Sequence, residues 1–342
     1  MRLNRFVPEF YPGTSKPKSY ESQVTVFPES GGQYDAVIRM NEPLRLSGWT
    51  LYQMSWGQDS LHLGRCALNP TTMQHNKYKI VPTRKPKKVA IIGGGIGGME
   101  CALVLKQRGH TPVIFEKTGA LGGLYITASA MSFKEADKAL LRWYERELMK
   151  NDIEVRFHME INDPATLRRE FDEILVCTGS APKTLPVKGF NKTINFTQLL
   201  LDQVDAGDRI VFFGGGQSSC EAAYEMVLRG KHPIIVEYAD DLIATPGTCL
   251  ANASFLREML AFKKVPVYLN ATITEIGDGF VQVKQKDGTE LRLECDSVVN
   301  GIGFVPAPIA PDDKKVHRVG TCEKWGNLRN VIWGAWDVCM HI

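Results

Sequence analysis

Two glycine-rich turns carry the residue types and spacings best suited to bind a nucleotide. In the first, Gly93, Gly95 and Gly98 form a G-x-G-x-x-G pattern after an apolar run at residues 89–92, and Glu116 stands 18 residues beyond the last glycine (116 minus 98). The first two glycines allow a tight turn and a close approach to a pyrophosphate, and the following helix presents unpaired N–H groups. The acid accepts hydrogen bonds from ribose hydroxyls. The pattern predicts a dinucleotide site that uses Gly93, Gly95, Ile96, Gly98 and Glu116.

The second turn repeats this arrangement. Gly214 and Gly216 follow an apolar run at residues 210–213, Ser219 occupies the third glycine position, and Glu237 again stands 18 residues further on (237 minus 219). The serine is expected to loosen the packing of helix on strand slightly and to leave the phosphate-facing turn intact. A carboxylate at Glu237 pairs with a free ribose 2′-hydroxyl and repels a 2′-phosphate, which favours NADH over NADPH. The predicted binding residues are Gly214, Gly216, Gln217, Ser218 and Glu237, and a decayed copy that binds nothing is the alternative.

The two turns belong to two copies of one supersecondary unit. Residues 88–116 and 209–237 align without a gap at an offset of 121 residues (209 minus 88). We expect strands at residues 89–92, 112–115, 210–213 and 234–236, and a helix from about residue 99 to residue 108. Apolar strand runs alternate with amphipathic helices to the end of the sequence. This pattern predicts an α/β fold with two Rossmann-like dinucleotide-binding domains.

Further motifs resemble those of the flavoproteins that have two dinucleotide-binding domains. The loop Leu121-Gly122-Gly123 is similar to the family's loop over FAD, and residues 174–182 (ILVCTGSAP) and 296–303 (DSVVNGIG) are similar to its two crossovers. Residues 316–322 (VHRVGTC) resemble its carboxy-terminal flavin-binding strand. The resemblance implies an FAD-binding domain at residues 87–190 and 297–342, with an NADH-binding domain inserted at 191–296. It adds as cofactor-binding residues Lys117, Gly123, Leu124, Thr178, Gly179, Gly301, Gly320 and Thr321.

A narrower resemblance concerns residues 62–342. Residues 65–70 (RCALNP) and 326–338 (GNLRNVIWGAWDV) look like the carboxy-terminal half of 2-enoate and 2,4-dienoyl-CoA reductases. In those enzymes electrons pass from NAD(P)H to FAD, a [4Fe–4S] cluster, FMN in a barrel, and an activated alkene. The barrel is absent here, Cys66 matches the last of four cluster cysteines, and Thr321 stands where the family has Asp. The resemblance therefore implies an FAD- and NADH-dependent module without a complete iron–sulfur cluster, which would pass electrons to an FMN-containing barrel protein or another acceptor.

The first 86 residues differ from the rest in composition. They are rich in Pro, Gly, Ser and aromatic residues, and residues 23–27 and 36–40 have the pattern of short strands. Segments at 17–22, 38–44 and 48–53 resemble part of the extracytoplasmic domain of ResB-type cytochrome c biogenesis proteins. We expect a small β-rich appendage and linker, to which no activity is assigned.

Composition narrows the class of function. The net charge is +3 and 44% of residues are hydrophobic, and no run approaches the 18 apolar residues of a membrane span. We expect a cytoplasmic protein that binds neither nucleic acid nor membrane and holds no metal. Eight cysteines occur without a Cys-x-x-Cys or Cys-x4-Cys pair, which argues against a disulfide reductase and favours reduced, mostly buried thiols.

No side chain stands out as an acid–base catalyst, because hydride transfer between cofactors needs little protein acid–base chemistry. Glu221, just after the second turn, either faces the nicotinamide or is an ordinary carboxylate near a helix start. Trp333 and Trp336 are expected to pack in the core. A truncated or fused nucleotide-binding fragment without turnover remains the alternative to an electron-transferring module.

Overall fold

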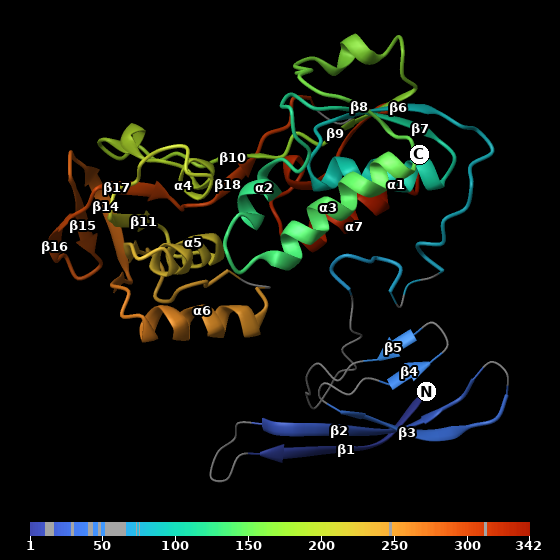
Figure 1. Ribbon diagram of the computed structural model, residues 1–342, viewed down its shortest axis with the longest axis horizontal. Helices are drawn as coiled ribbons and strands as arrows, with labels where there is room; N and C mark the ends of the chain where they lie inside the picture. The colour runs from blue at the N-terminus through green and yellow to red at the C-terminus, as the bar shows by residue number, and fades with distance from the viewer. Residues whose placement is uncertain are drawn as a thin grey trace. The chain divides into compact units, whose positions relative to one another are not determined.

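The computed structural model describes residues 1–10, 17–28, 31–39, 44–46, 49–51, 66–72, 74, 76–245, 248–310 and 313–342. The chain divides into two compact units, Met1–Lys77 and Tyr78–Ile342 (Figure 1). Among the described residues, no helix combines the length and hydrophobicity needed to cross a bilayer.

The first unit is built on an antiparallel sheet with the strand order β1(Arg2–Phe10), β2(Pro17–Val26), β3(Tyr34–Arg39). A short hairpin, β4(Leu44–Leu46) with β5(Trp49–Leu51), accompanies it. Val24, Val26 and Ile38 are buried, as expected where alternate strand residues face one side of a sheet. The predicted β-rich character is confirmed. Residues 40–43, 47–48 and 52–65, which carry part of the ResB-type resemblance and Arg65, lie outside the described residues.

The second unit contains two parallel sheets, and the first of them has five strands. Its order is β19(Val316–Arg318), β9(Glu173–Val176), β6(Lys88–Ile92), β7(Thr111–Phe115), β8(Glu154–Arg156). On one face, Val89 and Ile91 pack against the helices α1(Ile96–Gln107), α3(Glu135–Lys150) and α7(Leu328–Cys339). On the other face, Ala90 and Ile92 pack against η1(Pro164–Leu167) and Phe171. Burial on both faces explains the continuous apolar strands.

A second parallel sheet has the order β13(Val267–Tyr268), β12(His232–Val236), β11(Arg209–Phe213), β17(Ser297–Asn300). The helices α4(Phe196–Leu200), α5(Gln217–Leu228) and α6(Leu250–Phe262) share the core on one face. An antiparallel sheet, β14(Ala271–Ile276), β15(Phe280–Gln285), β16(Glu290–Glu294), packs on the other. Because β17 pairs with β11, the second sheet continues through Asn300, past the domain boundary predicted at residue 297.

Two antiparallel strands connect the sheets. The chain leaves the first sheet through β10(Ser180–Pro182) and returns through β18(Phe304–Pro306), and the two strands pair with each other (Figure 1). The remaining short elements are α2(Leu124–Ser129), η2(Phe190–Lys192) and η3(Gly320–Cys322). The predicted α/β class with two Rossmann-like sheets and an amino-terminal β sheet is confirmed. Helix α1 begins at Ile96 rather than near Met99, because Gly95 is already its N-cap.

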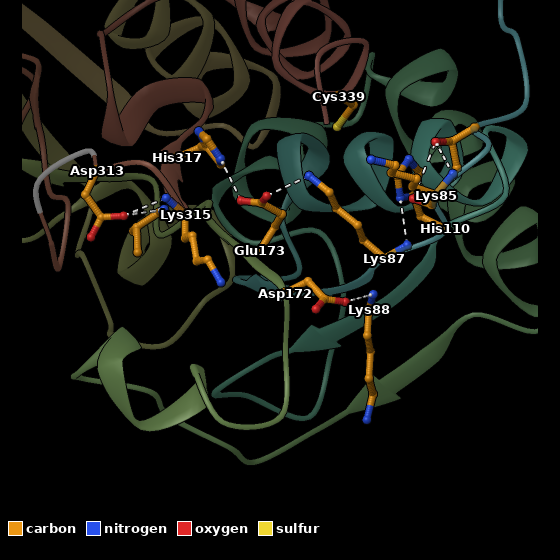
Figure 2. A network of polar contacts seen from close by, with 12 residues as sticks. Lys85, Lys87, Lys88, His110, Asp172, Glu173, Asp313, Lys315, His317 and Cys339 are labelled. Carbon is orange, nitrogen blue, oxygen red and sulfur yellow. Dashed lines mark hydrogen bonds and ion pairs between the residues drawn. The ribbon is translucent and has the colours of Figure 1, made fainter.

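Charged side chains tie the amino-terminal ends of β6, β9 and β19 together (Figure 2). Glu173 accepts from Lys87 Nζ at 2.7 Å and lies 3.1 Å from His317 Nε2. The Lys88 amide donates to Asp172 Oδ2 at 2.9 Å. The strands are parallel, so this network stands at the edge of the sheet opposite to the glycine turn, and it supports the fold rather than a ligand site.

Candidate nucleotide-binding sites

The first turn has the geometry that its glycines predict. Gly93 adopts φ +110°, and a Cβ there would lie 2.5 Å from the Cys177 carbonyl oxygen. A Cβ on Gly98 would lie 2.0 Å from the Gly93 oxygen, so helix α1 packs closely on the turn. A Cβ on Gly95, by contrast, would have Gly122 O at 3.9 Å as its nearest neighbour. The backbone at Gly95 is therefore open where those of Gly93 and Gly98 are packed against protein atoms.

Glu116 is held at the rim of this turn. Its side chain is buried, Oε2 accepts from the Gly94 amide at 2.8 Å, and Oε1 accepts from the Thr118 amide and hydroxyl, each at 2.8 Å. A carboxylate oxygen has two acceptor positions, so Oε2 keeps one for a ribose hydroxyl. The sequence analysis did not identify Thr118 as a residue of this site. A hydroxyl residue two positions after the acid is the feature that could have indicated it. Lys117 is exposed and lies 3.9 Å from Glu160.

The predicted cover loop lies directly against the turn. The Gly122 amide donates to Gly94 O at 2.8 Å, and a Cβ on Gly123 would lie 3.3 Å from Gly95 Cα. Gly123 has φ +54° and is the N-cap of α2, whose first residue, Leu124, is 45% exposed. The loop therefore borders the open side of Gly95, as expected for a segment that covers a bound cofactor.

The carboxy-terminal residues predicted for the site reach the same edge of the sheet. Strand β19 pairs with β9, so Gly320 and Thr321 follow β19 beside the Thr178-Gly179 pair that follows β9. A Cβ on Gly179 would lie 3.8 Å from Thr321 Oγ1, and Thr178 Oγ1 donates to Ala307 O at 2.8 Å. Thr321 therefore lies beside Gly179, at the same edge of the sheet as the first glycine turn.

The second turn repeats the geometry of the first. Gly214 has φ +107°, and a Cβ there would lie 2.6 Å from the Gly301 oxygen. Gly216 is the N-cap of α5, and a Cβ there would meet nothing within 4 Å. Glu237 Oε2 accepts from the Gly215 amide and Oε1 from the Ala239 amide at 2.7 Å. The acid is again fixed beside an open turn, with acceptor capacity left on both oxygens.

Ser219, which replaces the third glycine, is accommodated by another glycine. Its side chain is buried, and its Oγ lies 3.5 Å from the Gly301 oxygen. A Cβ on residue 301 would lie 2.3 Å from that Oγ. Gly301, predicted as a cofactor-binding residue, therefore has a structural task, which is to leave room for Ser219.

Both helix starts are free to attract an anion. Neither Gly95 nor Gly216 provides a side-chain cap, and neither α1 nor α5 has an acidic residue in its first turn. No acidic side chain within the first turn of either helix therefore offsets the partial positive charge of its start. Ser218 is exposed, and Gln217 Nε2 donates to Glu221 Oε1 at 2.9 Å. The Glu221 carboxylate also pairs with Lys134 at 3.0 Å, so it is engaged by protein groups.

Two surface cavities lie away from the turns. One is bordered by residues before β11 and at the end of α5, among them Asp205, Gly207 and Arg229. The other borders Gly279 and Cys295. The first stands at the amino-terminal edge of the second sheet, whereas the turn after β11 stands at the carboxyl edge. Neither cavity coincides with the predicted nucleotide sites.

The cysteines are not joined by disulfides in the structure. All eight are free thiols, and six are buried, whereas Cys66 and Cys249 are exposed. Burial raises the pKa of Cys220 to about 12 and that of Cys295 and Cys322 to about 11. These buried thiols stay protonated at neutral pH and are poor nucleophiles.

Known proteins share this arrangement. Residues 87–320 match the family described as pyridine nucleotide-disulphide oxidoreductase. The chain is 32% identical to cinnamate reductase of Clostridium sporogenes, over 81% of this chain and 42% of that protein. It is 30% identical to NADH oxidase of Thermoanaerobacter brockii, over 80% and 42%. The chain thus spans less than half the length of these relatives, matching their carboxy-terminal FAD/NAD halves.

Solved structures agree. A complex of 2-naphthoyl-CoA reductase superposes with a TM-score of 0.75 at 26% identity, over 81% of this chain and 43% of that one. Thioredoxin reductase of T. acidophilum, at 20% identity and a TM-score of 0.58, covers 75% of this chain and 97% of its own, and shows the shared fold. Members of the matching family bind FAD and NAD(P)H. The chain belongs to the pyridine nucleotide-disulphide oxidoreductase family and is akin to the reductase halves of enoate-type reductases.

Proposed function

We propose that this chain is an FAD-dependent oxidoreductase module that takes a hydride from NADH and passes electrons to a separate acceptor. The observation that carries the proposal is the pair of open turns, at Gly95 and Gly216, each backed by a fixed carboxylate. We assign FAD to the first sheet, residues 87–190 and 301–342, and NADH to the second, residues 191–300, taking β17 with the sheet that it joins.

The residues present fit both cofactors. The start of α1 would bind the FAD pyrophosphate beside Gly95, Glu116 Oε2 would bind its ribose, and the loop at Gly123 and Leu124 would cover it. Thr178, Gly179, Gly320 and Thr321 border the same edge, where Thr321 can both donate and accept a hydrogen bond. Bound FAD supplies the hydride-accepting ring, and the protein supplies orientation and exclusion of water.

We propose that Glu237 selects NADH over NADPH. Its two oxygens are held by the amides of Gly215 and Ala239, so the carboxylate cannot easily swing away from the ribose position. A fixed negative charge there accepts from a 2′-hydroxyl and repels a 2′-phosphate. Lys117 at the first site and Gln217 and Ser218 at the second are further proposed contacts.

The acceptor is proposed to be a flavin-containing protein or domain outside this sequence. Cinnamate reductase and 2-naphthoyl-CoA reductase are named for unsaturated acids or thioesters, and this chain matches 42% and 43% of their lengths. By analogy, the electrons would pass to FMN in a barrel and then to an activated alkene. Because Cys66 alone matches the cluster cysteines of the enoate-type reductases, we propose that this chain holds no complete iron–sulfur cluster. We also propose a cytoplasmic location.

The test is a spectrum of the purified chain. We expect a yellow protein, or one that takes up added FAD, and anaerobic bleaching by NADH faster than by NADPH. Glu237→Arg should lose the preference for NADH, whereas Glu258→Arg, an exposed control on α6, should keep it. A protein that takes up no FAD and does not oxidise NADH with any dye would contradict the proposal and leave a non-catalytic nucleotide-binding fragment.

A further inference from the structure

The segment between α2 and α3, residues 130–134, belongs in chain order to the FAD-binding domain, yet its side chains are bound by the NADH-binding domain. Met131 is 2% exposed and forms part of the apolar core of the second sheet, together with Phe196, Cys220 and Ala223. A side chain this deeply inserted fixes the position of its backbone, since withdrawing a buried apolar group from such a core exposes it to water and leaves a cavity.

Polar contacts flank this apolar insertion. The amide and hydroxyl of Ser132 both donate to Glu225 Oε2, at 2.9 and 2.7 Å. Glu225 is 3% exposed, and its other oxygen accepts from Arg229 at 2.9 Å. Thr127, at the end of α2, lies 2.9 Å from Thr197 of α4 through their hydroxyls. The segment is therefore held by hydrogen bonds as well as by packing.

Lys134 makes the contact nearest to the second turn. Its Nζ lies 3.0 Å from Glu221 Oε1, with the two side chains 21% and 12% exposed. Glu221 also accepts from Gln217, the first residue of α5. On the other side Lys134 lies 3.8 Å from Asp137, which accepts from the Tyr125 hydroxyl. A chain of polar contacts thus runs from the residue after Leu124 to the residue after Gly216.

We propose that residues 130–134 are an interdomain anchor that positions α5, and the NADH bound at its start, against the FAD-binding domain. The inference rests on the proposed function and assigns Lys134, Glu221 and Glu225 as positioning residues. Glu221 and Glu225 are four positions apart and so lie on one face of the helix whose amino terminus forms the NADH turn. The anchor therefore acts directly on the element that binds the nucleotide.

Geometry explains why such an anchor matters. Hydride transfer requires reacting atoms about 3–3.5 Å apart, and a displacement of about 1 Å can slow a reaction roughly a hundredfold. The crossover strands β10 and β18 form one connection between the domains, and rotation about one connection is the ordinary expectation for two domains. Contacts away from that connection, at Met131, Ser132 and Lys134, oppose the rotation.

The experiment compares three lysine variants of the full chain loaded with FAD. Lys134→Met removes the charge and keeps the length of the side chain, and Lys134→Arg keeps the charge. Lys138→Met is the matched control, because Lys138 lies on α3 and pairs with Glu135 of the same helix at 3.0 Å. Stopped-flow reduction by NADH separates the limiting rate from the apparent Kd. Hydrogen–deuterium exchange of the same variants, prepared separately without FAD or NADH, reports the protection of residues 127–136.

We expect Lys134→Met to lower the limiting rate about tenfold or more while the Kd for NADH changes less than about twofold, and to speed exchange at residues 127–136. Lys134→Arg should restore most of the rate, and Lys138→Met should match the wild type in both readouts. Ser132→Ala, a smaller change that should not prevent folding, should shift both readouts in the same direction. Equal limiting rates and equal exchange in Lys134→Met and the wild type would overturn the anchor.

Failure of the proposed function has a different signature. A wild-type protein that binds FAD but is not bleached by NADH would reject the proposed reaction, and the positioning role with it. A wild type that is bleached, with variants that react equally fast, rejects the anchor alone. Faster exchange with an unchanged limiting rate also rejects the positioning role, since it would show a contact that only stabilises the fold.

Discussion

Replacing Gly216 by alanine should weaken NADH binding and leave the fold intact. The residue has φ −67° and ψ 174°, a conformation that alanine adopts freely, and its Cβ would meet no protein atom within 4 Å. Alanine gains about 0.4–1 kcal/mol by restricting the unfolded chain, and loses a similar amount as a poorer N-cap than glycine. The free energy of unfolding should therefore change by less than about 1 kcal/mol.

The same methyl group would occupy the space that a pyrophosphate needs in order to approach the start of α5. Losing one hydrogen bond to a charged group costs about 1.5–3 kcal/mol, which weakens the Kd roughly 10- to 150-fold. The assay is calorimetric titration of the full chain with NADH, together with thermal unfolding of the unliganded protein. Gly334→Ala is the control, since a Cβ at Gly334 of α7 also meets nothing within 4 Å.

The result that would refute the reasoning is specific. An unchanged Kd for NADH in Gly216→Ala would show that no phosphate approaches this turn, and the second site would lose its main support. A large fall in the melting temperature would show that the space beside Gly216 is needed by the protein itself. Gly334→Ala should bind NADH like the wild type, and any weakening there would mean that the titration reports on stability.

Three further outcomes follow from other contacts. Gly301→Ala should lower the free energy of unfolding by about 1–3 kcal/mol, because its Cβ would lie 2.3 Å from Ser219 Oγ, and Ser219→Gly in the same chain should recover part of the loss in urea denaturation. Burial raises the pKa of the Glu100 carboxyl above 4.5, even though Tyr144 and Trp336 donate hydrogen bonds to it, so stability should fall as the pH rises from about 4.5 through that raised pKa; Glu100→Gln should lack this fall, and parallel stability curves for the variant and the wild type would contradict the assignment. Glu173→Ala should cost about 1–3 kcal/mol of stability by leaving Lys87 and His317 without their shared carboxylate, and should leave FAD affinity unchanged because the network stands at the edge of the first sheet opposite to the turn at Gly95; altered FAD affinity would contradict this placement.

Local backbone requirements made much of the fold and of both turns predictable. Gly93 and Gly214 have φ of +110° and +107°, a region open mainly to glycine, so their identity alone marks the turn. The strands before and after each turn are buried on both faces and appear as apolar runs. The predicted packing of Trp336 in the core is confirmed, because the residue is 8% exposed.

Contacts between distant parts of the chain were not predictable. Ser132 and Glu225 are 93 residues apart in sequence, and nothing local to residues 130–134 shows that Met131 enters the core of the other domain. Glu221 illustrates the same limit, since the sequence left open whether it faces the nicotinamide, and the structure pairs it with Lys134. A pattern of periodicity describes which face of a helix is apolar, and it says nothing about which partner covers that face.

Ser219 packs against the residue that follows the neighbouring strand, and this contact differs between the two repeats. A Cβ on Gly93 would meet the oxygen of Cys177, and a Cβ on Gly214 would meet the oxygen of Gly301, so residues 177 and 301 hold equivalent positions after strands β9 and β17. The first repeat has glycine on the helix and a side chain after the strand, whereas the second has the side chain on the helix and glycine after the strand. The two repeats therefore each place one side chain and one glycine at this pair of contacting positions, in opposite order. The expected loosening of the packing at Ser219 is therefore wrong, because Gly301, 82 residues away, leaves the space that the Ser219 side chain fills, and the turn at Gly214 keeps the geometry of the first one.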